Sequence, residues 1–343
     1  MRTWFDHGTA AALAVAVLMA CRASLSAQET HLLLVAGLPG QETYRERFHD
    51  WGSTIRAAAV ERLSVPAENV TWLADDPAMS PEQIRERATL ASMQKAVSDI
   101  ARHAAADDRV LIVLIGHGTT GAAGARFNLS GPDLSPEALD MMLDEFAPRR
   151  VALVHTGSAS GEFVPALSGP GRTVITATRS GRENNETWFA GFFAEALAGD
   201  SSDLDKDGRI SLLEAFRYSR REVQRYFEER NLLATEHALL DDDGDGEGTM
   251  EPGDVTEDGF LARTFYVGSP PLASAAGSER PSQIEDPVLA RLYEEREALE
   301  QRVVGHRLRR EQMDPAEYER ELEEMLVELA LKAREIRRRE GGG

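Results

Sequence analysis

Cysteine is almost absent from this sequence: Cys21 is the only one among 343 residues. A single cysteine cannot form a disulfide within the chain. Because Cys21 lies in the N-terminal segment that we interpret below as a targeting signal, residues 28–343 contain no thiol that could act as a nucleophile. The sequence beyond residue 27 therefore excludes cysteine chemistry.

Basic residues are too few to balance the acidic ones. The chain has 38 Lys and Arg against 58 Asp and Glu, a formal net charge of −20. Such a charge repels the phosphates of nucleic acids and attracts cations, so we expect no nucleic-acid partner. With 42% hydrophobic residues the chain can still bury a sizeable core, which predicts a globular domain with an appendage.

Long apolar runs are also lacking, apart from Ala10–Ala20 near the N-terminus, which is short for a membrane span. Together with the small and polar residues that follow it, this run predicts a signal peptide over residues 1–27. Two processing routes remain open: cleavage after small residues near Ala27, or lipidation of Cys21 in a lipobox-like context. Both predict an exported protein, periplasmic or envelope-associated, whose only membrane attachment would be a lipid at Cys21.

Short β-branched runs alternate with amphipathic stretches over residues 28–268, the pattern of a parallel sheet covered by helices. We therefore expect an α/β fold, a three-layer α/β/α domain with a mostly parallel six-stranded sheet. The predicted strands are His31–Ala36, Val70–Leu73, Arg109–Ile115, Val151–His155, Arg172–Thr178 and Leu261–Val267. The predicted helices are Tyr44–Leu63, Pro81–Ala106, Ser135–Phe146 and Thr187–Ala198.

The C-terminal part of the chain changes character. Residues 269–287 are rich in Pro, Ser, Ala and Gly and predict a linker. Residues 288–340 predict a helical hairpin or coiled coil, with helices at Val288–Arg310 and Pro315–Arg339. This segment could fold on itself or on the main domain, form a coiled-coil dimer, or mediate contact with another protein.

Two polar turns follow neighbouring predicted strands. The third strand ends in His117-Gly118, and the fourth is followed by Thr156-Gly157-Ser158. Ligands and catalytic groups of open α/β sheets gather at the carboxyl ends of the strands. His117 and Ser158 are therefore candidates for a base and a hydroxyl nucleophile.

These turns resemble the two catalytic motifs of legumains, and they are similar to those of caspases. His117-Gly118 matches the histidine motif, and Ser158-Ala159-Ser160-Gly161 matches Cys-x-Ser-Gly with serine in place of the catalytic cysteine. The resemblance covers about residues 30–268 and implies a caspase-like fold with a peptidase-type site. It extends to Val35-Ala36-Gly37, Tyr44-Arg45, Asp107-Asp108-Arg109 and Thr176-Ala177-Thr178.

The sequence departs from legumains at several site positions. Gly37–Gly40 lacks the asparagine that orients the family's histidine, and Thr156 replaces an acidic residue two positions before the nucleophile. Arg45 is interpreted as a remnant of the substrate pocket. Arg179 begins a stretch where caspase-like proteins place another part of that pocket.

A serine hydroxyl needs a strong, well-oriented base, whereas a thiol ionises near neutral pH. We therefore expect a peptidase homologue without cysteine-peptidase activity, acting in binding or scaffolding with a peptide or protein partner. The alternative is an active hydrolase or peptidase that uses Ser158 with His117.

The segment Asp203–Glu214 matches the twelve-residue calcium loop of an EF-hand. Gly208 supplies the sharp turn, and residues 188–198 and 212–230 provide the flanking helices. The sequence therefore predicts a Ca²⁺ site. Its ligands would be Asp203, Asp205, Asp207, the carbonyl of Arg209, Ser211 and Glu214.

A second acidic turn carries Asp241, Asp243 and Asp245 at the spacing of the first half of such a loop. It has Pro252 where the closing glutamate should stand. Two interpretations remain open: a second metal site closed by Glu251 or Asp254, and an acidic surface loop.

Overall fold

A computed structural model describes residues 28–147, 149–206, 208–253, 258–268, 287–307, 309 and 313–340. Its centre is a seven-stranded sheet in which six strands are parallel and the last, β9, is antiparallel to β8. The strand order is β3-β2-β1-β4-β7-β8-β9. The strands are β1 (Thr30–Ala36), β2 (Val70–Ala74), β3 (Ile84–Arg87), β4 (Arg109–Ile115), β7 (Arg150–His155), β8 (Arg172–Thr176) and β9 (Leu239–Asp241).

The central strands form because their residues are apolar on both faces. In β1, Leu32 and Leu34 face one core cluster, whereas Leu33 and Val35 face the other, and none of the four is exposed. Each such side chain stabilises the fold by roughly 1.5–3 kcal/mol relative to exposure. A sheet buried on both faces requires a layer of helices on each side.

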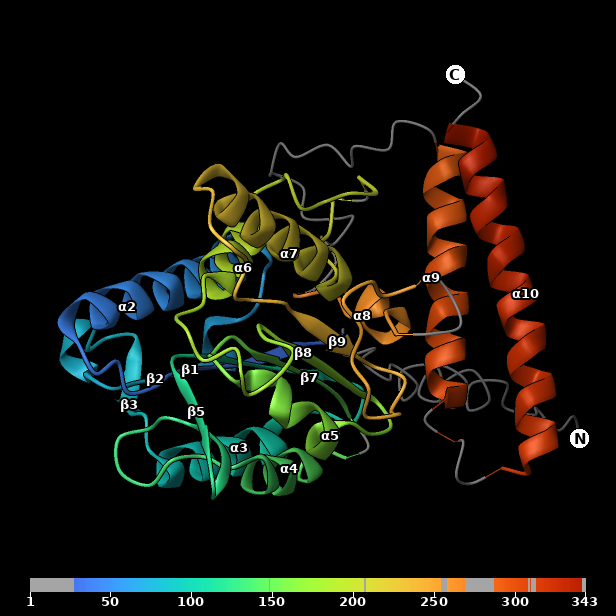
Figure 1. Cartoon of the computed structure of the whole chain (residues 1–343). Helices are drawn as coiled ribbons and strands as arrows, with labels where there is room; N and C mark the ends of the chain where they lie inside the picture. Colours follow the sequence, from blue (N-terminus) through green and yellow to red (C-terminus); the bar gives the residue numbers. More distant parts are fainter. Residues whose placement is uncertain are drawn as a thin grey trace, which may run out of the picture.

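The helices supply these two layers (Figure 1). Residues of α2 (Glu42–Ala57), α6 (Phe189–Ala198) and α7 (Leu212–Glu229) pack in the first core cluster. Residues of α3 (Leu90–His103), α4 (Pro136–Asp144) and α5 (Val164–Leu167) pack in the second. The predicted three-layer α/β/α class with a mostly parallel sheet is confirmed. Short helical turns occur at Ala58–Arg62, Ala67–Asn69, Pro77–Met79 and Ser160–Phe163.

The C-terminal segment forms two long antiparallel helices, α9 (Pro287–Arg307) and α10 (Pro315–Glu340), at one side of the main domain (Figure 1). Leu299, Val303 and Val304 of α9 pack with Phe260 and Leu261 of α8 (Phe260–Thr264). The hairpin is therefore docked on the main domain through an apolar contact.

Predictions for two segments concern residues outside those described. They are the signal peptide at residues 1–27, including Cys21, and residues 269–286 of the linker. Within the described ranges, every helix is too short or too polar to cross a bilayer.

One helix prediction and one strand prediction differ from the structure. Strand β3 lies inside the predicted helix Pro81–Ala106, of which only Leu90–His103 is helical. The predicted strand Leu261–Val267 is wrong: it contains α8 and then pairs with the segment before α7, where Val267 N–H donates to the Ile210 carbonyl (3.2 Å). The sheet has seven strands instead of six because β3 and β9 join it and this segment does not.

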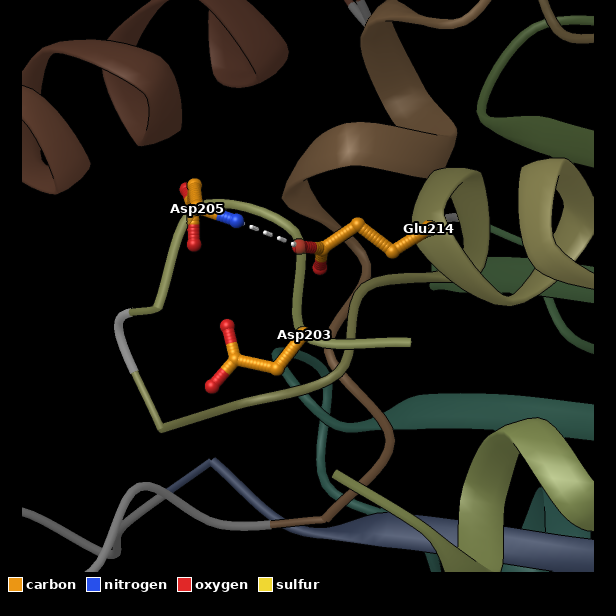
Figure 2. Close-up of side chains that lie close together, drawn as sticks. All are labelled: Asp203, Asp205 and Glu214. Atoms are coloured by element: carbon orange, nitrogen blue, oxygen red, sulfur yellow. Dashed lines mark hydrogen bonds between the residues drawn. The ribbon is translucent and has the colours of Figure 1, made fainter. Parts of the chain in front are cut away.

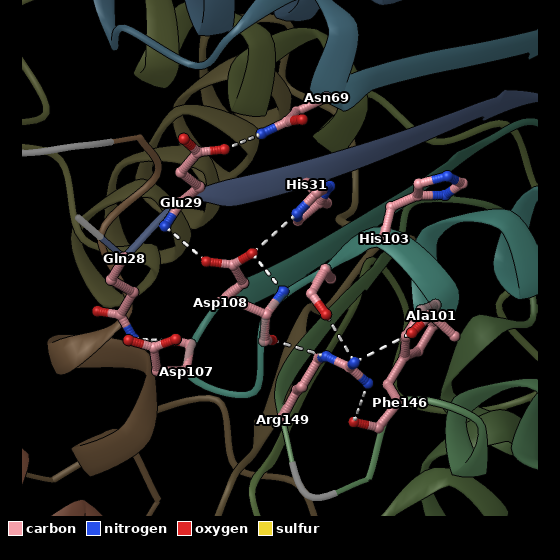
Figure 3. Close-up of polar contacts among 12 residues, drawn as sticks. Gln28, Glu29, His31, Asn69, Ala101, His103, Asp107, Asp108, Phe146 and Arg149 are labelled. Atoms are coloured by element: carbon pink, nitrogen blue, oxygen red, sulfur yellow. Dashed lines mark hydrogen bonds and ion pairs between the residues drawn. The ribbon is translucent and has the colours of Figure 1, made fainter. Parts of the chain in front are cut away.

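The amino-terminal edge of the sheet is held by polar contacts (Figure 3). Asp108 accepts hydrogen bonds from the backbone N–H groups of Glu29 (2.9 Å) and Ala105 (2.8 Å) and pairs with His31 (3.1 Å). Arg149 donates to carbonyls at the end of α3, including that of Ala104 (2.7 Å). Asp108, one of the legumain-like positions, thus joins β1 to β4 at the edge opposite the polar turns.

Two further strands, β5 (Gly118–Gly121) and β6 (Gly124–Phe127), form an antiparallel hairpin directly after His117. The backbone N–H of Asn128 donates to the His117 carbonyl (3.0 Å). The hairpin therefore fixes the backbone of the histidine turn.

Candidate functional site

The topology brings His117 and Ser158 to the same edge of the sheet. His117 follows β4 and Ser158 follows β7, and these two strands are paired, with Leu114 opposite His155. Because both strands run in the same direction, the turns after them lie side by side. The two predicted dyad residues therefore belong to neighbouring turns.

His117 lies against aromatic rings. Its ring contacts those of Tyr44 (4.5 Å between centroids) and Phe48 (5.1 Å) edge-on. Burial lowers the pKa of His117, while the charge of Glu186 and the backbone of Pro39 oppose this shift. A lowered pKa keeps the imidazole neutral at pH 7, which is the form that can accept a proton.

Glu186 is the acidic residue whose charge acts most strongly on His117, and the sequence did not single it out individually. Its carboxylate forms an ion pair with Arg47 (2.9 Å). The Arg47 guanidinium also lies over the ring of Trp188 (4.4 Å). Glu186, the acid near His117, is therefore paired with an arginine that lies over the Trp188 ring.

The Ser158 hydroxyl is engaged by the backbone of Gly118. It donates to the Gly118 carbonyl (3.0 Å) and accepts from the Gly118 N–H (3.1 Å). Ser158 is only 3% exposed. Across the described residues, Ser158 and His117 share no hydrogen bond, and the hydroxyl is engaged by Gly118 instead.

The same contact affects the group that would stabilise an oxyanion. A backbone N–H beside the nucleophile is a suitable oxyanion donor only when it is free to point at the substrate. The Gly118 N–H instead binds the Ser158 oxygen. A Cβ at position 118 would lie 2.1 Å from the Ser158 carbonyl oxygen, so only glycine allows the two turns to approach this closely.

Thr156 holds the backbone of the site in place through two hydrogen bonds. It is buried, and its hydroxyl donates to the Leu114 carbonyl (2.8 Å). The Thr156 carbonyl in turn accepts a hydrogen bond from the Thr187 hydroxyl (2.5 Å). These contacts tie β7 to β4 and to the segment before α6.

The two predicted pocket arginines are both ion-paired. Arg45 pairs with Glu42 and with Asp75 (3.5 Å). Arg179, with a side chain 54% exposed, pairs with Glu183 (3.1 Å). Arg45 contributes to a small hollow at the ends of β1 and β2 that is also lined by Ala36, Gly37, Pro39, Phe48, His49, Ala74, Asp75, Asp76 and Met79.

His155, the last residue of β7, lies in the core. It is fully buried, packs edge-on against Phe127 (5.2 Å) and Phe163 (4.6 Å), and accepts a hydrogen bond from the Gly157 N–H (3.2 Å). Burial lowers its pKa to about 3. It therefore stays neutral and has a structural role.

The first acidic loop gathers carboxylates as the sequence predicts (Figure 2). Asp203, Asp205 and Glu214 offer oxygens that all lie within 4.8 Å of one another. The closing residue, Glu214, is buried and receives hydrogen bonds from the backbone of Leu204 (2.9 Å) and Ser211 (2.9 Å). Asp207 lies outside the described residues.

The surroundings of this loop fit a cation. Burial first, and then the charge of Asp205, raises the pKa of Glu214. Gly208, at φ +80°, and Lys206, at φ +59°, both adopt left-handed backbone that allows a tight loop. Ser211 caps α7, and Arg209 places its guanidinium over Tyr266 (3.8 Å). Clustered carboxylate oxygens are the donors that Ca²⁺ prefers.

The second acidic turn gathers a different set from the one predicted. Asp241 and Asp243 come together with Asp258, and their oxygens lie within 4.8 Å of one another. Asp245 is not part of that cluster. Of the two alternatives for a closing ligand, Glu251 pairs with Arg220, and Asp254 lies outside the described residues.

Comparisons with known proteins give weak similarity in structure alone. No protein-family model matches the sequence, and no curated protein matches it. A Geobacter sulfurreducens protein of known structure is 14% identical, with a TM-score of 0.41 over 62% of this chain and 92% of its own. A secreted C11 cysteine protease from Bacteroides thetaiotaomicron, iotapain, is 9% identical, with a TM-score of 0.37 over 63% of this chain and 67% of its own. The fold class therefore rests on the sheet described above.

Proposed function

We propose that this chain is a calcium-binding homologue of caspase-like peptidases that acts in binding or scaffolding and not in peptide hydrolysis. The observation that carries this proposal is the pairing of the Ser158 hydroxyl with both backbone groups of Gly118. A reaction would require the hydroxyl to leave two hydrogen bonds and find a base. The neighbouring N–H would also have to turn toward the substrate.

Calcium binding is supported by the first acidic loop. The carboxylates of Asp203, Asp205 and Glu214 converge there, and Glu214 is held by backbone N–H groups. We propose Asp203–Glu214 as the Ca²⁺ loop, with Asp207 and the Arg209 carbonyl as further ligands. Export to the periplasm or envelope belongs to the same proposal and rests on the sequence of residues 1–27.

A fluorophosphonate probe and a peptide-library digest in calcium test the catalytic part of the proposal. We compare the natural chain with Ser158→Ala and Ser158→Cys. We expect no labelling and no cleavage in any of the three, because the pocket positions Thr156, Arg45 and Arg179 are all engaged in internal contacts.

Two outcomes would change the conclusion. Labelling or cleavage by the natural chain that disappears in Ser158→Ala would identify a serine hydrolase. Activity in Ser158→Cys alone would mean that the site still binds and orients substrate and that only the nucleophile has been lost.

A further inference from the structure

The carboxylates of Asp241, Asp243 and Asp258 form a cluster separate from the first acidic loop. Asp241 ends β9 and Asp243 follows it, while Asp258 precedes α8. One oxygen from each lies within 4.8 Å of the others. An acidic cluster alone does not identify a site, because carboxylates gather on many protein surfaces without a ligand.

Asp241 supplies a second, independent observation. Its side chain is completely buried, at 0% exposure. One carboxylate oxygen, Oδ1, accepts a hydrogen bond from the Ser168 hydroxyl (2.9 Å). The other, Oδ2, is buried and has no hydrogen-bond partner within the described part of the chain. A buried carboxylate oxygen without a partner is destabilising unless a proton or a cation meets it.

The charges around Asp241 increase this need. Asp243 and Asp258 each bring a carboxylate oxygen within 4.8 Å of an Asp241 oxygen, and Asp258 is itself buried. Like charges this close repel one another, and a cation between them removes the repulsion. A cation satisfies all three carboxylates at once.

The backbone around the cluster is held in place without any ligand. Asp258 Oδ1 accepts from the N–H groups of Asp242 (2.7 Å) and Asp243 (3.3 Å). Asp242 in turn accepts from the N–H groups of Gly259 (2.8 Å) and Ala262 (2.7 Å). The two segments that carry the ligands are therefore fastened to each other.

We propose that Asp241, Asp243 and Asp258 form a second divalent-cation site, in which Asp258 supplies the closing carboxylate that an EF-hand takes from its twelfth position. Pro252 occupies that twelfth position here. An all-oxygen set from two separate segments suits Ca²⁺, which tolerates irregular coordination, better than Mg²⁺, which requires a near-ideal octahedron. This site shares no residue with the first loop, so it goes beyond the proposed function.

Titration calorimetry with CaCl₂ on the chelator-treated full chain tests the proposal. We expect two equivalents of Ca²⁺ for the natural chain and one each for Asp241→Asn and Glu214→Gln. The double variant should bind none. Asp245→Asn is the matched control: it removes an aspartate from the same turn but outside the cluster, so it should keep two equivalents.

Thermal melting of the same variants separates binding from folding. In chelator, Asp241→Asn should melt at or above the temperature of the natural chain because it removes one of three repelling charges, and calcium should raise its melting temperature less. If Asp241→Asn does not fold, Asp243→Asn, which changes an exposed residue of the same cluster, tests the site by the same measurements.

The outcomes of these titrations are distinguishable. Two outcomes would overturn the second site. In the first, the natural chain binds one equivalent of Ca²⁺ and Glu214→Gln binds none. In the second, Asp241→Asn and Asp243→Asn both still bind two equivalents. If the natural chain binds one equivalent of Ca²⁺ that is lost in Asp241→Asn or Asp243→Asn but not in Glu214→Gln, the second site is supported and the first loop is disproved.

Discussion

Both serines of the turn after β7 are engaged in joining strand ends. Ser158 binds both backbone groups of Gly118, at the end of the neighbouring β4. Ser160 pairs with the Thr178 hydroxyl (3.1 Å) and accepts from the Thr178 N–H (3.1 Å), after β8. The turn therefore holds three adjacent strand ends together, which gives both hydroxyls a structural role.

The buried histidine of β7 predicts a specific response to acid. The pKa of His155 is lowered to about 3 by burial, while an unfolded histidine titrates near 6.5. Below about pH 6.5 the unfolded chain gains a proton that the folded chain cannot take up. The stability contributed by the neutral ring is therefore complete above that pH and falls as pH decreases toward 3, by about 1.4 kcal/mol per unit.

His155→Phe should remove this part of the pH dependence. Phenylalanine keeps an aromatic ring between Phe127 and Phe163 and cannot be protonated. Chemical denaturation of both chains between pH 7 and pH 4 gives the free energy of unfolding as a function of pH. The difference between the two slopes isolates His155, because the carboxylates contribute equally in both chains. Parallel pH profiles for the two chains would mean that His155 titrates normally in the fold.

At the scale of whole elements, periodicity predicted the central strands well and the edges poorly. Strands β1, β4 and β7 begin within one residue of their predicted starts because each is a continuous apolar run buried on both faces. Strand β3 reads Ile-Arg-Glu-Arg and belongs to the edge of the sheet, where polar side chains reach solvent. A strand of four residues is too short for its hydrophobic pattern to be distinguished from the charged, helix-like sequence around it.

Spacing along the chain could predict which acidic residues come together where they belong to a single loop. Asp203, Asp205 and Glu214 converge because they belong to one loop of fixed length. Asp258 could not have been found in this way, since it is brought to Asp241 by hydrogen bonds between Asp242 and the start of α8. Strand order placed His117 beside Ser158, but the direction of the Ser158 hydroxyl depends on the approach of Gly118.

The docking of the C-terminal hairpin predicts an asymmetry between its two apolar faces. Val303 of α9 is fully buried against α8, whereas Val327 of α10 is 54% exposed. We expect Val303→Asp to destabilise the docked hairpin by about 3 kcal/mol or more, because it places an unpaired charge among Phe260, Leu261 and Leu329.

Limited proteolysis combined with calorimetry checks this expectation. Val303→Asp should release α9 and α10 to protease while the main domain keeps its cooperative transition, since neither large core cluster includes a residue of the hairpin. Val327→Asp, the matched control, should resemble the natural chain. Equal protease resistance in both variants would contradict the docked arrangement.

For the molecule as a whole, the net charge of −20 and the proposed calcium sites are connected. Each bound Ca²⁺ would reduce the self-repulsion of an acidic chain, and calcium would favour the compact state by mass action. Both acidic clusters also lie close to the hairpin. Asp242 caps α8, on which α9 rests, and Arg296 of α9 reaches Asp205 in the first loop (3.3 Å).

The contact between Arg296 and Asp205 predicts that calcium and the hairpin influence each other. The Arg296 guanidinium and a bound Ca²⁺ would act on the same carboxylate, so each should weaken the binding of the other, by the same factor in both directions. Arg296→Gln should therefore raise the calcium affinity of the first loop about threefold to tenfold, which corresponds to about 0.7–1.4 kcal/mol.

The matched control is Arg302→Gln, which removes another arginine of α9 that pairs with Glu328 inside the hairpin (3.2 Å) and should leave the affinity unchanged. Both variants are titrated in the Asp241→Asn background, so that only the first loop contributes heat. Reciprocity adds a second measurement: calcium should make the hairpin of the natural chain more accessible to protease and have little such effect in Arg296→Gln. A weaker calcium affinity in Arg296→Gln would mean that the arginine pre-organises the loop for calcium, and the coupling would then have the opposite sign.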